Sequence, residues 1–155
     1  MRALTYLGPW QMAVQENPAP NVPNGWVLID VIATGICGSD AHGYTGSTGR
    51  RIPGQVMGHE MVGMLRSPLP HIPAGSVVTF NPAIGCGTCA ACRAGQTQVC
   101  PSLRVIGVDP ALAGSFADSV VVPAANVVEL SGSMPISHGA LVEPLAVGFH
   151  AVMRG

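Results

Sequence analysis

Four of the five cysteines in this 155-residue chain lie in one short segment, with the spacing C-x2-C-x2-C-x7-C. Thiolates this close, with glycines between them that permit tight turns, can close a tetrahedron around one zinc ion. A shell of four sulfur atoms leaves no open position for a substrate, so a zinc ion held there would be structural. These cysteines are Cys86, Cys89, Cys92 and Cys100.

The number of cysteines also permits disulfides, because four thiols could form two bridges. However, the chain has a fifth cysteine, Cys37, which leaves an odd number. The Cys-x2-Cys spacing of the clustered cysteines is typical of metal sites in reducing compartments. We therefore expect bound metal rather than disulfides, and a cytoplasmic location.

The charge of the chain restricts its partners. Its net charge is −1 and it has no run of basic residues, which argues against nucleic acid and anionic membrane surfaces as partners. No apolar run approaches the ~20 residues that span a bilayer, and the N-terminus lacks the apolar segment of a secretory signal.

Only 10% of residues are charged, whereas a typical domain has roughly a quarter. We therefore expect either a soluble domain of low charge or a surface that a neighbour covers, with self-association or poor solubility in isolation.

The chain is rich in residues that interrupt secondary structure, with 20 glycines and 14 prolines scattered along it. Between them lie short runs rich in β-branched residues, which predict a mainly β fold of the sandwich or barrel type. The predicted strands are Arg2–Tyr6, Trp26–Ala33, Met61–Arg66, Ser76–Phe80, Asp118–Val122 and Asn126–Leu130.

The last residues, 137–155, change to a helical pattern that contains Pro144. A proline disfavours the helical conformation of the residue before it, so we expect a bend at Glu143 and a new helix that starts at Pro144. The Glu143 carboxylate would then lie at a helix N-terminus, where the helix dipole favours its ionised form.

A second metal site is predicted from residues outside the cysteine cluster. Cys37 is followed, about twenty residues later, by Gly58-His59-Glu60. A thiolate, an imidazole and a carboxylate with one open position make a zinc site that can act as a Lewis acid. A single Cys and a single His are more often buried structural residues, but the nearby four-cysteine cluster favours the metal interpretation.

Together these motifs resemble the N-terminal catalytic domain of the zinc-containing medium-chain alcohol dehydrogenases, in the branch of polyol, butanediol and threonine dehydrogenases. The resemblance covers essentially the whole chain. It rests on the four-cysteine segment and on three motifs, which are Gly35-Ile-Cys-Gly-Ser-Asp-Ala-His42, Gly58-His-Glu60 and Leu141-Val-Glu-Pro-Leu-Ala-Val147. One departure is Gly75-Ser-Val-Val78, where the family commonly has an acid and a base.

The resemblance implies a mainly β, GroES-like, partly open barrel over residues 1–140, with a zinc lobe at 81–105. Residues 141–155 would be a helical junction leading to a Rossmann cofactor domain that the chain does not contain. The near-match Gly85-Cys-Gly-Thr-Cys-Ala90 lies inside the cysteine cluster and is followed by no helical pattern, so we do not interpret it as a nucleotide-binding loop.

The resemblance also implies the ligands of two zinc ions. Cys37 and His59 would bind the catalytic zinc, and the third ligand would be Glu60 or Glu143, with exchange or a bridging water as further alternatives. Glu60 could instead be an acid that tunes the metal without binding it. The four clustered cysteines would bind the structural zinc.

The family's proton relay corresponds to Ser39 and His42 in this chain. A small hydroxyl next to the reacting alcohol passes a proton outward, and an imidazole near its own pKa completes the transfer. The alternative for His42 is an exposed loop histidine without a role. His71, His138 and His150 match no position of the motifs.

The predicted function is that of the substrate- and zinc-binding domain of a dehydrogenase that oxidises a secondary alcohol or polyol, with hydride transfer to NAD(P) in the complete enzyme. The chain alone would bind zinc but would not complete the reaction. One alternative is a stand-alone zinc-binding or GroES-like interaction module without catalysis, and another is a zinc hydrolase. The substrate, the choice between NAD and NADP, and the oligomeric state are not determined by the sequence.

Overall fold

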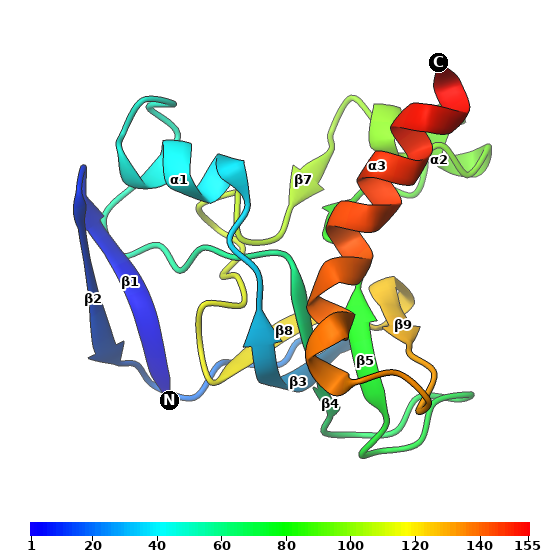
Figure 1. Cartoon of the computed structure of the whole chain (residues 1–155). Helices are drawn as coiled ribbons and strands as arrows, with labels where there is room; N and C mark the ends of the chain where they lie inside the picture. Colours follow the sequence, from blue (N-terminus) through cyan, green and yellow to red (C-terminus); the bar gives the residue numbers. More distant parts are fainter.

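The computed structural model describes residues 1–155, and its centre is a five-stranded antiparallel sheet. Figure 1 shows this sheet at the base of the molecule. In spatial order its strands are β8 (Ser119–Pro123), β3 (Trp26–Thr34), β4 (Met61–Leu65), β5 (Val77–Phe80) and β9 (Val127–Glu129). The longest strand, β3, pairs with both β4 and β8, so it organises the sheet.

Two small sheets flank the central one. Strands β1 (Arg2–Gly8) and β2 (Gln11–Glu16) form an antiparallel hairpin, and β6 (Ala83–Ile84) and β7 (Arg104–Val105) pair at the base of the cysteine-rich segment. The sheets do not close into a barrel. The prediction of a mainly β, partly open fold is confirmed.

The hydrophobic core lies on one face of the central sheet. In β3 the side chains of Val27 and Ile29 are buried while their neighbours are less so, which is the alternation expected of a strand with one face on the core. Side chains from β4, β5, β8 and the loop after β7 complete this core. Its buried members are Val27, Ile29, Met61, Leu65, Val78, Phe80, Ile106, Leu112, Val120 and Val122.

The helices are short except the last. They are α1 (Gly38–Tyr44), α2 (Ala90–Arg93) and α3 (Val142–Arg154), with 3-10 turns η1 (Thr97–Val99), η2 (Ala124–Asn126) and η3 (Ile136–Leu141). In Figure 1, α1 and the β1–β2 hairpin lie on one side of the molecule, and α2 and α3 lie on the other.

The bend predicted at Glu143 is wrong, because Glu143 and Pro144 are both inside the first turn of α3. The first N–H groups of a helix have no acceptor within the helix, so Pro144 removes no hydrogen bond there. The change in geometry falls earlier, at Leu141, where η3 passes into α3. Glu143 does lie in the first helical turn, as expected.

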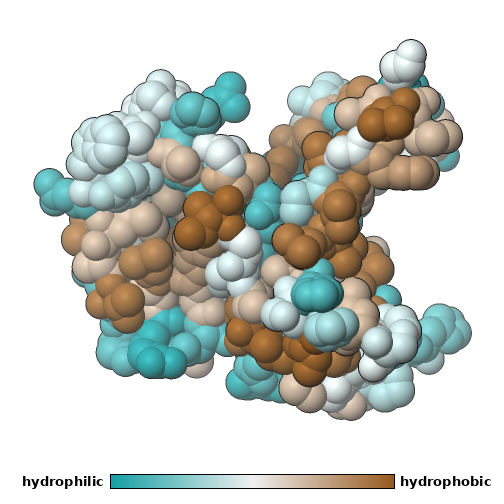
Figure 2. Space-filling view, viewed as in Figure 1, coloured by the Kyte–Doolittle hydropathy of each residue, from teal (hydrophilic) through white to brown (hydrophobic).

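Helix α3 extends away from the sheet with little cover. Leu145, Phe149 and Val152 are 68%, 70% and 79% exposed, and Figure 2 shows apolar side chains along this helix. Together η3 and α3 form a 19-residue stretch that could cross a membrane by length and composition alone, which is weak evidence. This stretch is longer than any apolar run that we expected from the sequence. Its first part is tied to the domain, because η3 contacts β3, β4 and β5 and its Gly139 and Ala140 are buried.

Candidate metal centres

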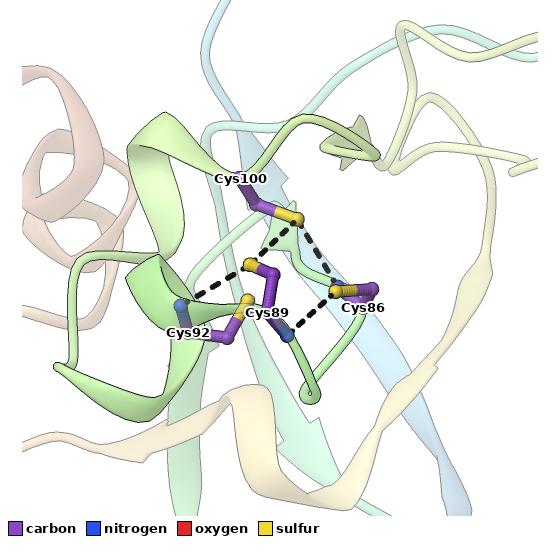
Figure 3. A group of neighbouring side chains, drawn as sticks. All are labelled: Cys86, Cys89, Cys92 and Cys100. Carbon is purple, nitrogen blue, oxygen red and sulfur yellow. Dashed lines mark hydrogen bonds between the residues drawn. The ribbon is translucent and has the colours of Figure 1, made fainter.

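The four clustered cysteines converge in the lobe between β6 and β7 (Figure 3). Their sulfur atoms all lie within 4.8 Å of one another, and none of the thiols is in a disulfide. One pair, Cys89 and Cys100, has its sulfur atoms 3.9 Å apart, far beyond the ~2.05 Å of a disulfide bond. The donor set fits one tetrahedral zinc ion.

Backbone N–H groups support these sulfur atoms. The N–H groups of Cys86, Cys89 and Cys92 each donate to a cysteine sulfur at 3.4 Å. Hydrogen bonds from Thr88 and then Cys89 lower the pKa of Cys86 to about 6. Such bonds favour the thiolate, which is the form that binds metal.

The second candidate centre consists of Cys37, His59 and Glu60, whose ligand atoms also lie within 4.8 Å of one another. Strand β3 ends at Thr34, which pairs with Met61 at the start of β4. The residues that follow β3 and those that precede β4 are therefore neighbours. The Gly35 N–H donates to the Glu60 carbonyl at 2.6 Å, which holds the two segments together.

The turn before His59 depends on glycine. Gly58 has a φ of 96°, a left-handed conformation that favours glycine. A Cβ at Gly58 would also lie 2.5 Å from the Phe116 ring. Gly107 and Gly114 pack so closely on Gly58 that a Cβ on either would overlap its backbone. His59 and Glu60 therefore lead from a tightly packed corner into β4, and both are buried.

Asp40, in the first turn of α1, lies behind these ligands. Its side chain is 2% exposed, and its Oδ2 accepts the Cys37 N–H at 3.1 Å. Its Oδ1 lies 3.9 Å from His59 Nδ1, and neither of these buried atoms has a hydrogen-bond partner. With Nδ1 facing a carboxylate, the other ring nitrogen of His59 is left for a metal, which is the usual arrangement of metal-binding histidines. The site therefore fits a zinc ion.

Glu143, the alternative third ligand, is not part of this cluster. It is half-buried, and burial raises its pKa, which His59 lowers in part and Glu60 raises further. Glu143 is therefore close enough to His59 and Glu60 for their charges to shift its pKa. It also lines a groove of about 700 Å³ between α3, the end of β5 and the cysteine lobe.

The predicted relay residues both lie on α1, beside Cys37. Ser39 and His42 are exposed and are three residues apart, which places them on the same face of the helix. Sequence reasoning assigned no role to Asp40, although it lies in the same motif. Its position as the third residue of a helix capped by Cys37 is the pattern that could have indicated a capping contact.

Comparison with known proteins agrees with this description. The model of the alcohol dehydrogenase GroES-like domain family matches residues 23–132, so the chain belongs to this family.

Among curated relatives, the L-threonine 3-dehydrogenase of Pyrococcus abyssi is 40% identical over 146 residues, which cover 90% of this chain and 41% of that protein. The sorbitol dehydrogenase of Bacillus subtilis is 31% identical over 160 residues, covering 99% of this chain and 45% of that protein. The chain thus spans less than half the length of these relatives.

Solved structures show the same likeness. Galactitol-1-phosphate dehydrogenase from Escherichia coli has a TM-score of 0.89 and 30% identity, covering 97% of this chain and 44% of that chain. A zinc-binding dehydrogenase from Sinorhizobium meliloti bound to NADP has a TM-score of 0.86 and 33% identity, covering 97% of this chain and 44% of that chain.

Proposed function

We propose that this chain is the zinc- and substrate-binding part of a zinc-dependent dehydrogenase that oxidises a secondary alcohol or polyol, with NAD(P) as hydride acceptor. The observation that carries the proposal is the convergence of Cys37, His59 and Glu60 from segments about twenty residues apart. The names of the relatives, which include threonine and sorbitol dehydrogenases, support the same class of substrate.

The three side chains would hold a zinc ion through one thiolate, one imidazole and one carboxylate. Bound zinc supplies a Lewis acid that lowers the pKa of an alcohol. Cys37 is half-buried at the start of α1, whereas His59 and Glu60 are buried. A substrate oxygen would therefore approach the cluster from the side of Cys37. Glu143, in the first turn of α3, would be the competing carboxylate.

Ser39 and His42 would move the substrate's proton. The Ser39 hydroxyl lies two residues from Cys37 and would accept the proton from the alcohol. His42 lies almost one helical turn further on and is exposed, so it would deliver the proton to solvent. A histidine suits this role because its ordinary pKa is close to neutral pH.

The four-cysteine lobe would hold a second, structural zinc, since its four sulfur atoms leave no position for a substrate. Hydride transfer would need NAD(P) on a Rossmann domain outside these 155 residues. The described chain would therefore bind zinc but would not turn over alcohol by itself.

Metal content tests this proposal. The protein, expressed with zinc, is expected to hold about two zinc ions per chain by elemental analysis. Cys37→Ser is expected to remove one of them, and Cys92→Ser the other. If the parent holds about one zinc and Cys37→Ser leaves that value unchanged, the chain is a zinc-binding module without a catalytic metal.

A further inference from the structure

Arg51 differs from every other arginine of the chain. There are seven arginines and no lysines, and the other six are exposed. The Arg51 side chain is 3% exposed. Its Nη1 donates to the carbonyl oxygens of Gly107 and Val108 at 2.8 and 2.7 Å, so the guanidinium is fixed in place by the backbone.

The other terminal nitrogen of this guanidinium, Nη2, faces Asp40. Arg51 Nη2 lies 3.7 Å from Asp40 Oδ1, and both side chains are almost fully buried. A buried carboxylate is costly unless a positive charge or hydrogen bonds compensate it. Arg51 is the one permanent cation within ion-pair distance of Asp40, since His59 is charged only when protonated.

Asp40 in turn touches both segments of the candidate metal centre. One of its oxygens accepts the Cys37 N–H, and the other lies next to the His59 ring. A single carboxylate therefore contacts the backbone of Cys37 and lies next to the imidazole of His59. Arg51 lies in the loop that connects α1 to β4, and its side chain joins Asp40 of α1 to the backbone that follows β7.

Helix α1 leaves room for the arginine. A Cβ on Gly43 would lie 2.5 Å from Arg51 Nε and 3.0 Å from its Cγ. The absence of a side chain at Gly43 is therefore needed for Arg51 to reach Asp40. The close packing of Arg51 on Gly43 is separate from the hydrogen bonds that Arg51 donates to the carbonyls of Gly107 and Val108.

We propose that Arg51 is a positioning residue for the Cys37–His59–Glu60 centre, and that it acts by holding the Asp40 carboxylate against Cys37 and His59. The proposal rests on the proposed function, because it assumes that the centre binds metal. Arg51 does not touch the ligands. It holds Asp40, which accepts the Cys37 N–H and lies next to His59.

Metal affinity tests the proposal. Co²⁺ is titrated into metal-free protein and followed by its absorption spectrum, which differs between a four-thiolate site and a mixed site. Arg51→Met is expected to weaken binding at the Cys37 centre by about 10- to 100-fold, as found for residues that orient metal ligands, and to leave the four-cysteine site unchanged. Arg51→Lys keeps the charge but not the planar fork, so its affinity should lie between those of Arg51→Met and the parent. Arg50→Met is the matched control, because Arg50 is exposed and should have no effect.

A double variant separates positioning from general stability. If Arg51 acts through Asp40, then Asp40→Asn combined with Arg51→Met should bind Co²⁺ about as weakly as Asp40→Asn alone. This variant also removes both buried charges together, which protects folding, and the intact four-cysteine signal reports that the chain is folded.

Three results would overturn the inference. They are unchanged affinity in Arg51→Met, an equal loss at both metal sites, or additive losses in the double variant. A parent protein that binds Co²⁺ only at the four cysteines would overturn the proposed function together with this inference. A parent that fills both sites, with an unaffected Arg51→Met variant, would overturn this inference alone.

Discussion

Gly35→Ala should displace Glu60 without changing any residue of the metal centre. A Cβ at Gly35 would lie 2.5 Å from Glu60 Oε2 and 3.1 Å from Glu60 Cβ, whereas ordinary contacts begin at 3.4 Å. The carboxylate oxygen must therefore retreat by about 0.9 Å. Gly35 does not have a positive φ, so its backbone accepts alanine.

This displacement is large for a metal ligand. Metal–ligand distances hold to about 0.2 Å, so a carboxylate that retreats by several times this amount leaves the coordination sphere. We expect a loss of about 10- to 100-fold in metal affinity at the Cys37 centre, or about 1.4 to 2.7 kcal/mol. The crowded contact with Glu60 Cβ should also lower the free energy of unfolding by about 1 to 3 kcal/mol.

The assay is the Co²⁺ titration, together with urea unfolding. Gly38→Ala is the matched control, since a Cβ at Gly38 meets no atom within 4 Å. It should leave metal affinity unchanged and should raise the free energy of unfolding by about 0.4 to 1 kcal/mol, because alanine restricts the unfolded chain. If Gly35→Ala keeps full affinity while Glu143→Gln loses it, then Glu143 is the third ligand and the reasoning from the Glu60 contact is wrong.

Three further predictions concern the fold. Ile29→Ala should lower the free energy of unfolding by about 2 to 5 kcal/mol in urea, because Ile29 is fully buried in β3. Hydrogen bonds from Arg2 lower the pKa of Asp118 below its ordinary 3.8, so this pair stabilises the fold above that pH and the contribution is lost as pH falls through the lowered pKa. In urea unfolding, the free energy of unfolding of Asp118→Asn should therefore fall less between neutral and acidic pH than that of the parent protein. Cys92→Ser should lower the melting temperature of the zinc-loaded protein, and a chelator should then lower it less than in the parent.

The strands of the central sheet could be predicted because their sequences are apolar enough to indicate burial. The prediction Trp26–Ala33 corresponds to β3, and Asn126–Leu130 contains β9. Strand β2 was missed because none of its residues is buried, so it has no buried face to produce a pattern. It pairs with β1 across a tight turn at Trp10, whose positive φ is unusual for a tryptophan.

The candidate site could be predicted in part. The identities of Cys37, His59 and Glu60 follow from their motifs, and the register of β3 with β4 then brings them together. The separation of Glu143 from this cluster could not be predicted, because it depends on where α3 leaves the sheet. Arg51 was missed because nothing in its sequence context distinguishes it from the exposed Arg50.

Three glycines around the candidate centre allow its residues to pack closely, because a glycine has no side chain. Gly35 admits the Glu60 carboxylate, Gly43 admits the Arg51 guanidinium, and Gly58 forms the turn before His59. Gly35 and Gly43 let a charged group approach backbone that a side chain would push away, and Gly58 supplies the left-handed conformation of the turn. Because His59 and Glu60 are buried against closely packed backbone, they have little freedom to rearrange when a metal binds, so little ordering entropy would oppose binding. The same rigidity explains why single methyl groups at Gly35 and Gly43 should act on metal affinity, whereas one at Gly38, which faces open space, should not.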